Sequence, residues 1–304
     1  MAGSKEIRNK IKSVQSTRKI TKAMEMVAAS KMKKAQDRMR ASRPYLERAL
    51  EIAVHIAKAN AEYKHPFLSK REQTKRVGAI VVTTDKGLCG GLNTNVLRLA
   101  NQKHKEWQAA GLGADYVAIG SKGLAFLTRM GCNVVSSVTQ LGDRPQLDRM
   151  VGPVKALIDK YVAGEVDEVW LFYTAFINTM KQECRAGRIV PVPMQFRTPA
   201  GEVRKPEAAS GAWDYIYEPD ARALLDGMMR RYLEAIVYQA VAENMGSEQS
   251  ARMVAMKAAT EASEEMIKTL SRQYNRARQT QITMELLDIV GGANALAEAT
   301  AGSE

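Results

Sequence analysis

The residues best suited to chemistry form one glycine-rich segment, Thr84-Asp85-Lys86-Gly87-Leu88-Cys89-Gly90-Gly91-Leu92-Asn93. It follows a β-rich run and precedes a predicted helix, the position at which glycine loops bind phosphate. Its spacing matches neither GxGxxG nor GxxxxGK followed by Ser or Thr. Two interpretations stay open: a nucleotide or acyl site at Asp85 to Asn93, or a structural turn whose glycines permit a tight reversal.

Cys89 lies in the same segment, and a thiol near a helix N-terminus can become a nucleophile because its pKa falls there. Such catalysis also needs a base, and the three histidines at positions 55, 65 and 104 form no motif with it. Cys89, Cys132 and Cys184 stand far apart without a CxxC pair, which argues against a disulfide framework and a zinc site. We therefore expect no catalytic thiol at Cys89, no metal site, and a reducing compartment.

Composition and charge narrow the class of protein. The 304 residues are 45% hydrophobic and 26% charged, which is typical of a folded chain with room for two units. No run approaches the roughly 18 apolar residues that a membrane span needs. The net charge of +12 is concentrated at one end, because residues 1–76 hold 20 Lys or Arg against 7 Asp or Glu. Such a segment favours an acidic protein surface, anionic lipid or nucleic acid as its partner.

Both ends of the chain have the pattern of long helices. Gly and Pro are absent from residues 4–43 and from residues 247–290. At a spacing of seven, the N-terminal rows are Ile7, Val14, Thr21, Ala28, Ala35 and Ile11, Arg18, Glu25, Met32, Met39, Leu46. The C-terminal rows are Met256, Ser263, Leu270, Ala277, Met284 and Met253, Thr260, Ile267, Tyr274, Gln281. These rows predict a long antiparallel coiled coil, and helices of roughly 45 to 55 residues would protrude as a rod.

Between the two helices, β-rich and helical runs alternate from Val77 to Tyr173, which predicts a βαβ, Rossmann-like domain with a mostly parallel sheet. We expect Gln182 to Ala212, rich in Pro, Gly, Arg and Glu, to loop out. The fold class is thus α/β plus a long coiled coil. The predicted division is 1–64 for the N-terminal coiled-coil helix, 65–212 for the α/β domain and 213–304 for the C-terminal helix.

Several segments resemble the gamma subunit of bacterial F-type ATP synthases. They include KITKAMEMVAASKMKKAQDRM from Lys19 to Met39, TDKGLCGGLN from Thr84 to Asn93, and WDYIYEPD from Trp213 to Asp220. The strongest are SEQSARMVAMKAAT from Ser247 to Thr260 and YNRARQTQITMELLDIVGGA from Tyr274 to Ala293. They occur in the family's order over nearly the whole chain, whereas Gln182 to Ala212 matches poorly.

The resemblance implies a central rotor shaft that transmits the rotation of a proton-driven c ring to the alternating catalytic sites of an alpha/beta hexamer, for ATP synthesis or, in reverse, hydrolysis. The shaft itself would catalyse no reaction and bind no cofactor. The implied partners are three alpha and three beta subunits, the epsilon subunit and the c ring, with no nucleic acid. Membrane contact would be indirect, through the c ring, at the cytoplasmic face of the bacterial inner membrane.

The resemblance also implies site residues. The expected coupling contacts to alpha and beta are Met24, Lys22, Lys31, Lys33 and Lys34 in the N-terminal helix, and Arg252, Gln279, Thr283 and Glu285 in the C-terminal helix. Tyr215, Tyr217 and Glu218 match the foot that faces the c ring and epsilon, or form an ordinary capping turn.

Two other classes of function stay open on the residues alone. A basic coiled-coil protein with a calculated pI near 9.6 could bind nucleic acid or act as a scaffold. An enzyme could use the turn at Asp85 to Asn93.

Overall fold

The structure is a computed structural model that describes residues 4–59, 65–143, 145–192, 196–197, 203–204 and 221–301. The chain forms two compact units. One consists of Met1–Met26 with Ala255–Glu304, and the other consists of Val27–Val254.

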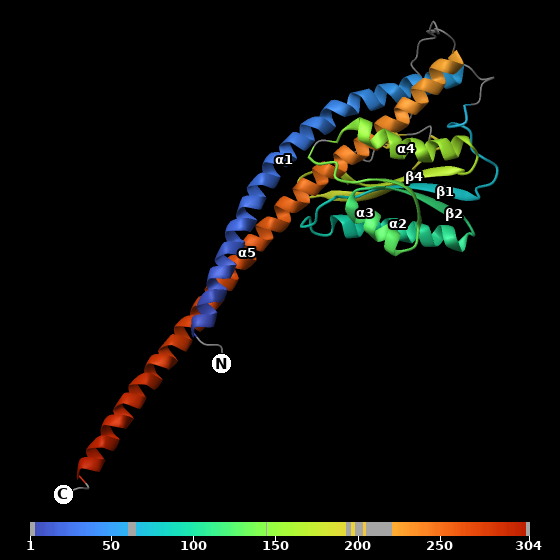
Figure 1. The fold of residues 1–304 in the computed structure, drawn as a ribbon. Helices are drawn as coiled ribbons and strands as arrows, with labels where there is room; N and C mark the ends of the chain where they lie inside the picture. The colour runs from blue at the N-terminus through green and yellow to red at the C-terminus, as the bar shows by residue number, and fades with distance from the viewer. Residues whose placement is uncertain are drawn as a thin grey trace. The chain divides into compact units, whose positions relative to one another are not determined.

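Two long helices, drawn in blue and in orange to red in Figure 1, contribute to both units. Helix α1 spans Ser4–Ala59 and continues through Pro44, and helix α5 spans the 81 residues Ala221–Ala301. Helix α5 is longer than the predicted 45 to 55 residues, because it continues through glycines, which a sequence pattern treats as helix breakers. Packing explains one of them: a Cβ at Gly246 would lie 3.4 Å from the Met39 side chain. Glycine there allows the backbone of α5 to approach α1 closely.

In the smaller unit, the two helices pack antiparallel. Thr21 contacts Thr260, and Arg18 contacts Glu264, so a step forward along α1 is a step back along α5. Ile7 and Thr21 of the first predicted row are buried, and so are Met256 and Thr260 of α5. The antiparallel coiled-coil prediction is confirmed for these segments.

The larger unit contains a five-stranded sheet with the order β3-β2-β1-β4-β5. The first four strands in the chain are parallel: β1 (Arg76–Val82), β2 (Gly113–Ile119), β3 (Asn133–Val138) and β4 (Glu168–Phe176). This confirms the mostly parallel sheet. A short separate pair, β6 (Phe196–Arg197) and β7 (Val203–Arg204), is antiparallel.

The fifth strand corrects a prediction. Gln182–Val190 forms β5, which pairs antiparallel with β4, whereas we expected the chain to loop out from Gln182. The misleading residues are the charged ones, Glu183, Arg185 and Arg188. Charged side chains are common on edge strands, where they discourage pairing with other chains. The charged residues of Gln182–Val190, which we interpreted as a loop, are therefore those of a strand at the edge of the sheet.

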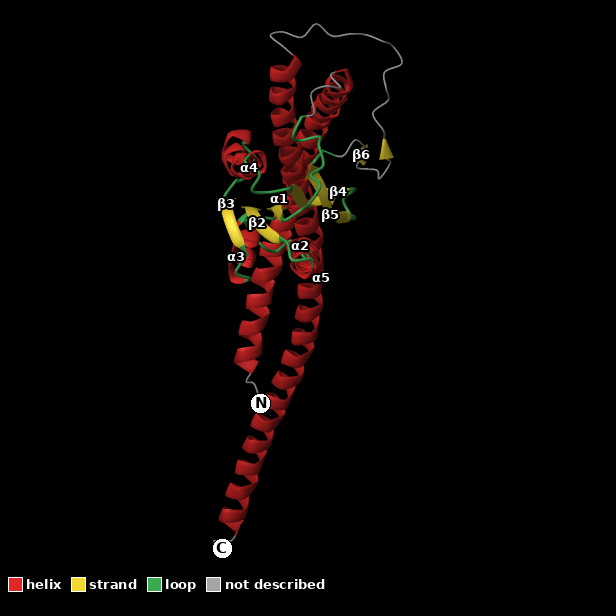
Figure 2. Cartoon of the chain, turned by 90° about the vertical axis from the view of Figure 1, so that its right-hand side faces the viewer, coloured by secondary structure: helices red, strands yellow, loops and turns green. Residues whose placement is uncertain are grey.

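Helices cover both faces of the sheet (Figures 1 and 2). Helices α2 (Leu92–Ala109) and α3 (Ser121–Arg129) pack on the face formed by Val77, Ala79 and Val81 of β1. Helix α4 (Leu147–Val162) and the first part of α5 share a core with Ile80 and Val82 on the other face. Because side chains alternate along a strand, β1 is buried on both sides, as is usual in a parallel sheet.

Candidate functional site

The predicted coupling residues fall into two groups according to unit. Lys22, Met24, Gln279, Thr283 and Glu285 belong to the smaller unit, and Lys31, Lys33, Lys34 and Arg252 belong to the larger one. The predicted foot residues Tyr215, Tyr217 and Glu218 lie outside the described residues. Each group is described in its own unit.

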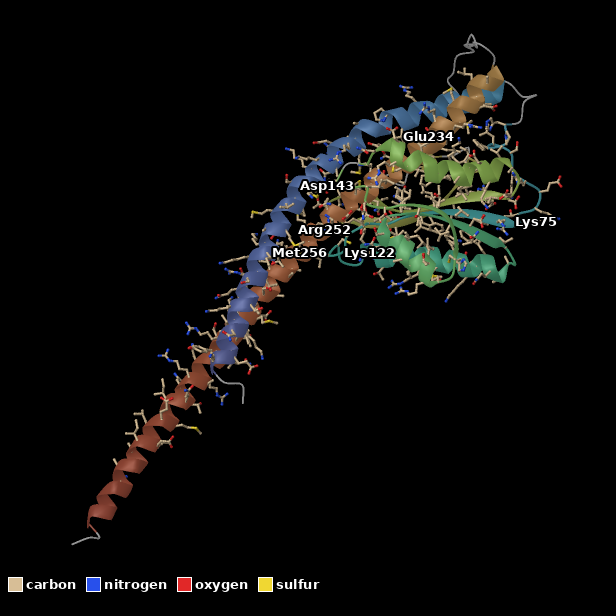
Figure 3. All side chains as sticks on the ribbon, viewed as in Figure 1. Lys75, Lys122, Asp143, Glu234, Arg252 and Met256 are labelled. Atoms are coloured by element: carbon tan, nitrogen blue, oxygen red, sulfur yellow. The ribbon has the colours of Figure 1, made fainter. Side chains whose placement is uncertain are left out.

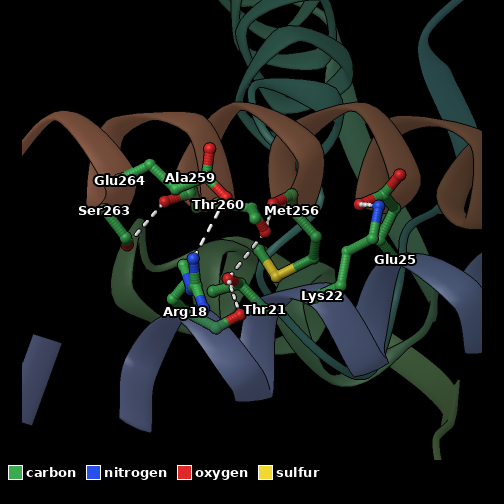
Figure 4. Close-up of polar contacts among 9 residues, drawn as sticks. All are labelled: Arg18, Thr21, Lys22, Glu25, Met256, Ala259, Thr260, Ser263 and Glu264. Carbon is green, nitrogen blue, oxygen red and sulfur yellow. Dashed lines mark hydrogen bonds and ion pairs between the residues drawn. The ribbon is translucent and has the colours of Figure 1, made fainter. Parts of the chain in front are cut away.

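The first group begins on α1. Lys22 is exposed, and its Nζ lies 3.1 Å from Oε2 of Glu25 (Figure 4). Met24, two residues further along the helix, is half-buried. Since an exposed ion pair contributes only about 0 to 1 kcal/mol, Glu25 leaves Lys22 able to exchange partners.

A buried pair of hydroxyl groups lies beside these residues. The Oγ1 atoms of Thr21 and Thr260 are 2.8 Å apart, and Figure 4 shows them between the two helices. Thr21 Oγ1 also lies 3.0 Å from Arg18 O, and Thr260 Oγ1 lies 2.9 Å from Met256 O. The two hydroxyls have two hydrogens for three contacts, so when one hydroxyl donates to the other, only one of the two carbonyl oxygens also receives a hydrogen. Polar groups inside a coiled coil are known to fix register, and this pair aligns α1 with α5.

The other members of the first group lie on the part of α5 that extends past Ser4, the first described residue of α1. In an antiparallel pair, each residue forward along α1 corresponds to one residue back along α5. Counting from the Thr21 and Thr260 contact, Ser4 lies opposite about residue 277. Consistent with this, Ala277 is half-buried while residues 278–294 are all exposed. Gln279, Thr283 and Glu285 are among them. Thr283 Oγ1 donates to Gln279 O at 2.9 Å, and Glu285 accepts from Gln281 at 3.0 Å.

Residues 278–294 of α5 are unusually apolar for an exposed helical segment. Its exposed large apolar residues are Ile282, Met284, Leu286, Leu287, Ile289 and Val290. Contiguous exposed apolar side chains mark interaction surfaces. Gln279, Thr283 and Glu285 therefore lie within a segment suited to contact a partner.

The second group begins with the lysines of α1. Lys33 and Lys34 are exposed. Lys31 Nζ lies 2.8 Å from Oδ2 of Asp143, a residue that follows β3. The hydrogen bond from Lys31 lowers the pKa of Asp143. Lys31 thus has a carboxylate partner in its own chain, and sequence reasoning did not identify Asp143.

Arg252 also has partners in its own chain. Its Nη2 lies 2.5 Å from Oε1 of Glu248 and 3.0 Å from the carbonyl oxygen of Gly87. Only 11% of the Arg252 side chain and 13% of the Glu248 side chain are exposed. Burial raises the pKa of Glu248, and the neighbouring Arg252 cation opposes that rise. Sequence reasoning missed Glu248, although its place four residues before Arg252 on a helix was a usable signal.

The polar side chains of the glycine-rich turn bond within the domain. Asp85 accepts from Ser121 N at 2.9 Å, Ser121 Oγ at 2.8 Å and Leu141 N at 3.1 Å. Asn93 accepts from Thr84 N at 3.0 Å and donates to Thr84 Oγ1 at 2.7 Å. Burial raises the pKa of Asp85, but the hydrogen bonds from residues 140, 121 and 141 outweigh it and lower the pKa overall. These contacts favour the structural turn over a phosphate site.

Cys89 lacks the environment of a reactive thiol. It is buried, and burial together with the nearby Glu248 carboxylate raises the pKa of the thiol. Two of the three histidines have other partners: His65 contacts Asp226, and His104 contacts the Tyr116 hydroxyl. An activated cysteine needs the opposite shift and an adjacent base.

Comparison with known proteins decides the family. A family model described as ATP synthase matches residues 3–296. ATP synthase gamma chains of Thiobacillus denitrificans and Cupriavidus pinatubonensis are 55% and 57% identical over 296 residues, covering 97% of this chain and 100% of each relative. The chain belongs to the ATP synthase gamma chain family.

Solved chains from ATP synthases have the same fold. A chain from the central stalk and c ring of the Tetrahymena thermophila mitochondrial ATP synthase is 23% identical, with a TM-score of 0.60, and covers 79% of this chain and 99% of its own length. A chain from the Euglena gracilis mitochondrial ATP synthase, in rotational state 3, is 16% identical, with a TM-score of 0.64, and covers 96% of this chain and 94% of its own length. At these identities the likeness concerns the fold alone.

The hydroxyl pair gives a stability prediction. Thr21→Val should lower the free energy of unfolding by about 1 kcal/mol, because it removes a buried hydrogen bond, and Thr260→Val should do the same. The double variant should be less destabilised than the sum of the two single variants, because each single variant already removes the same hydrogen bond between the hydroxyls. Denaturant unfolding of the full chain, monitored by circular dichroism, measures the stability of all three variants.

Thr280→Val is the matched control, since Thr280 Oγ1 donates to Arg276 O on the exposed surface of α5. Strictly additive effects would show that the two hydroxyls do not interact.

Proposed function

We propose that this gamma chain is the central rotor shaft of a bacterial F-type ATP synthase. The observation that carries the proposal is the match over 97% of the chain to bacterial ATP synthase gamma chains. The geometry agrees with it: two antiparallel helices need a partner for the exposed apolar segment of α5, and a hexamer with a central cavity supplies one. The chain transmits rotation and performs no bond chemistry of its own.

The proposed partners are three alpha and three beta subunits, the epsilon subunit and the c ring. Within the described residues, no helix is long and apolar enough to cross a membrane. We place the chain at the cytoplasmic face of the inner membrane, where its membrane contact is made through the c ring. The excess of 20 basic over 7 acidic residues in residues 1–76 supports an acidic collar as the surface facing α1.

The proposed contacts with the alpha and beta subunits are the nine predicted coupling residues, of which Arg252 also bonds to Glu248 and Gly87 within this chain. The exposed Lys22, Lys33 and Lys34 offer charges that form and break pairs at a cost of about 0 to 1 kcal/mol each. Weak contacts of this kind suit a rotating surface, because no single position holds the rotor. Residues 1–64, 65–212 and 213–304 are the proposed functional divisions: shaft helix, α/β domain and second shaft helix.

The test of function is reconstitution. Alpha and beta subunits from the same source are combined with and without this chain, and steady-state ATP hydrolysis is recorded. Activity that appears only with the chain, with stepwise rotation of a bead on the α/β domain, supports the shaft. If the chain leaves ATP hydrolysis by alpha and beta unchanged and instead binds nucleic acid, the alternative of a basic nucleic-acid-binding or scaffold protein replaces the proposal.

A substitution at Met24 tests coupling. Met24→Lys adds a second cation two residues from Lys22, which should hold an acidic segment of beta too tightly. We expect ATP hydrolysis to continue while proton pumping per ATP falls. Both rates are measured in membranes that carry the complex. Met26→Lys is the control, because Met26 is on the same helix and is 61% exposed. An unchanged pumping ratio in Met24→Lys would remove Met24 from the coupling surface.

The foot is proposed from the resemblance alone. Tyr215, Tyr217 and Glu218 would face the loops of the c ring and epsilon. A Tyr217→Cys variant should form a disulfide with a cysteine placed in a c-ring loop of the assembled enzyme. If no cross-link forms there, these residues are an ordinary turn before α5.

A further inference from the structure

The carboxyl ends of β1 and β4 form the point at which the order of the sheet reverses. Chain connections lead from β1 to β2 on one side, and β4 lies on the other side. In folds of this kind, ligands bind in the crevice at that point. Figure 3 shows Arg252, Asp143 and Lys122 at this end of the sheet, opposite Lys75. Here the position is taken by a segment of α5.

Directional bonds fasten that segment of α5 to the sheet. Ser247 Oγ donates to Thr174 O of β4 at 3.3 Å, and Ser250 Oγ donates to Thr179 O at 2.5 Å. Gln182 at the start of β5 donates to Ser250 Oγ at 3.2 Å. Ser247 and Ser250 are fully buried. These bonds hold α5 to the β4 and β5 side of the crevice.

Arg252 makes the corresponding contact on the β1 side. One nitrogen atom, Nη2, has two hydrogens and two acceptors, Glu248 Oε1 and Gly87 O. Glu248 therefore orients the guanidinium that holds the glycine-rich turn. With both partners inside the chain and 11% of its side chain exposed, Arg252 is placed for an internal contact.

The turn that Arg252 holds has a demanding backbone. Leu88, the residue after Gly87, has φ of 62°, a left-handed conformation that costs non-glycine residues energy. The side chain of Leu88 is 61% exposed, so packing of that side chain does not supply the compensation. Asp85 and Asn93 fix the two ends of the turn, and Arg252 fixes its middle. A contact from outside the turn is what such a conformation requires.

We propose that Glu248 and Arg252 form a clamp that fastens the glycine-rich turn, and with it the α/β domain, to helix α5. Glu248 is a positioning residue that acts through Arg252. Apolar packing is not directional and permits a helix to turn about its axis, whereas hydrogen bonds at fixed positions oppose that turning. If the chain is the shaft proposed above, the clamp makes the α/β domain and α5 rotate together.

Cys89 reports whether the clamp is closed. It lies two residues from Gly87 and is 2% exposed, so a maleimide reacts with it only when the turn opens. Cys132 and Cys184 are half-buried elsewhere in the domain and report changes that are not confined to the turn. Labelling rates of all three thiols are measured by mass spectrometry on the full chain for Glu248→Gln and Arg252→Gln. Arg231→Gln is the control, because it breaks an exposed pair with Glu234 on the same helix.

Both variants should speed Cys89 labelling by about tenfold or more, the effect expected for losing a hydrogen bond to a charged group. Cys132, Cys184 and the Arg231→Gln control should stay near wild type. Charge alone predicts a different pattern. Removing the Glu248 carboxylate favours the thiolate, while removing the Arg252 cation disfavours it. Acceleration in both variants therefore shows opening. Acceleration only in Glu248→Gln, in neither, or equally at all three thiols would overturn the clamp.

The role in rotation has a separate readout. In membranes that carry the complex, Glu248→Gln should lower proton pumping per ATP while alpha and beta are still activated. An open turn with an unchanged pumping ratio would overturn the clamp's part in rotation and leave the shaft intact. Reconstitution of the wild-type chain tests the shaft itself, so failure of that proposal is distinguished from failure of this one.

Discussion

The burial of α5 is the constraint on which the rest of the molecule depends. In the larger unit, Gln239 to Asn244 are six consecutive buried residues, so every side of the helix is covered there. In the smaller unit, α5 is buried along one stripe as far as Ala277 and is exposed from residue 278. The residues follow these environments: first buried apolar side chains, followed by buried amides and hydroxyls, then a heptad seam, then exposed apolar side chains. One continuous helix thus has three different surfaces.

The seam with α1 uses small residues to bring the helices close. Ala28 and Ala35 of α1 are buried, and Gly246 of α5 packs against Met39. Small side chains offer little shape with which to define register, because an alanine fits many positions equally well. The Thr21 and Thr260 hydroxyls supply that definition with a bond that forms in one alignment. Small residues thus allow close packing of the helices, and the threonine pair defines the register that small residues leave undefined.

Much of this fold follows from periodicity, and the exceptions have physical causes. The heptad rows identified Thr21, Ala28, Ala35 and Thr260 as facing inward, since burial repeats with the helix period. The β5 strand was missed because edge strands contain loop-like charges. The spacing of four residues between Glu248 and Arg252 signals an ion pair along the helix, but most such pairs lie on solvated faces, so the spacing does not indicate that this pair is buried. Only the tertiary fold reveals that this face lies on the glycine-rich turn, and only contacts reveal that Lys31 is paired with Asp143.

The glycine-rich turn at Thr84 to Asn93 contacts helix α5 of the same chain. Glycines after a parallel strand favour either phosphate binding or a tight reversal, and the pattern does not separate the two. What separates them is the direction of the polar groups: Asp85, Thr84 and Asn93 bond to the domain, and the carbonyl of Gly87 accepts from Arg252 of α5. A carbonyl turned toward a cation is the reverse of the amide nest that an anion needs. The crevice in which related folds hold a ligand therefore holds a helix of the same chain, and the residues at that crevice act as a joint between the domain and α5.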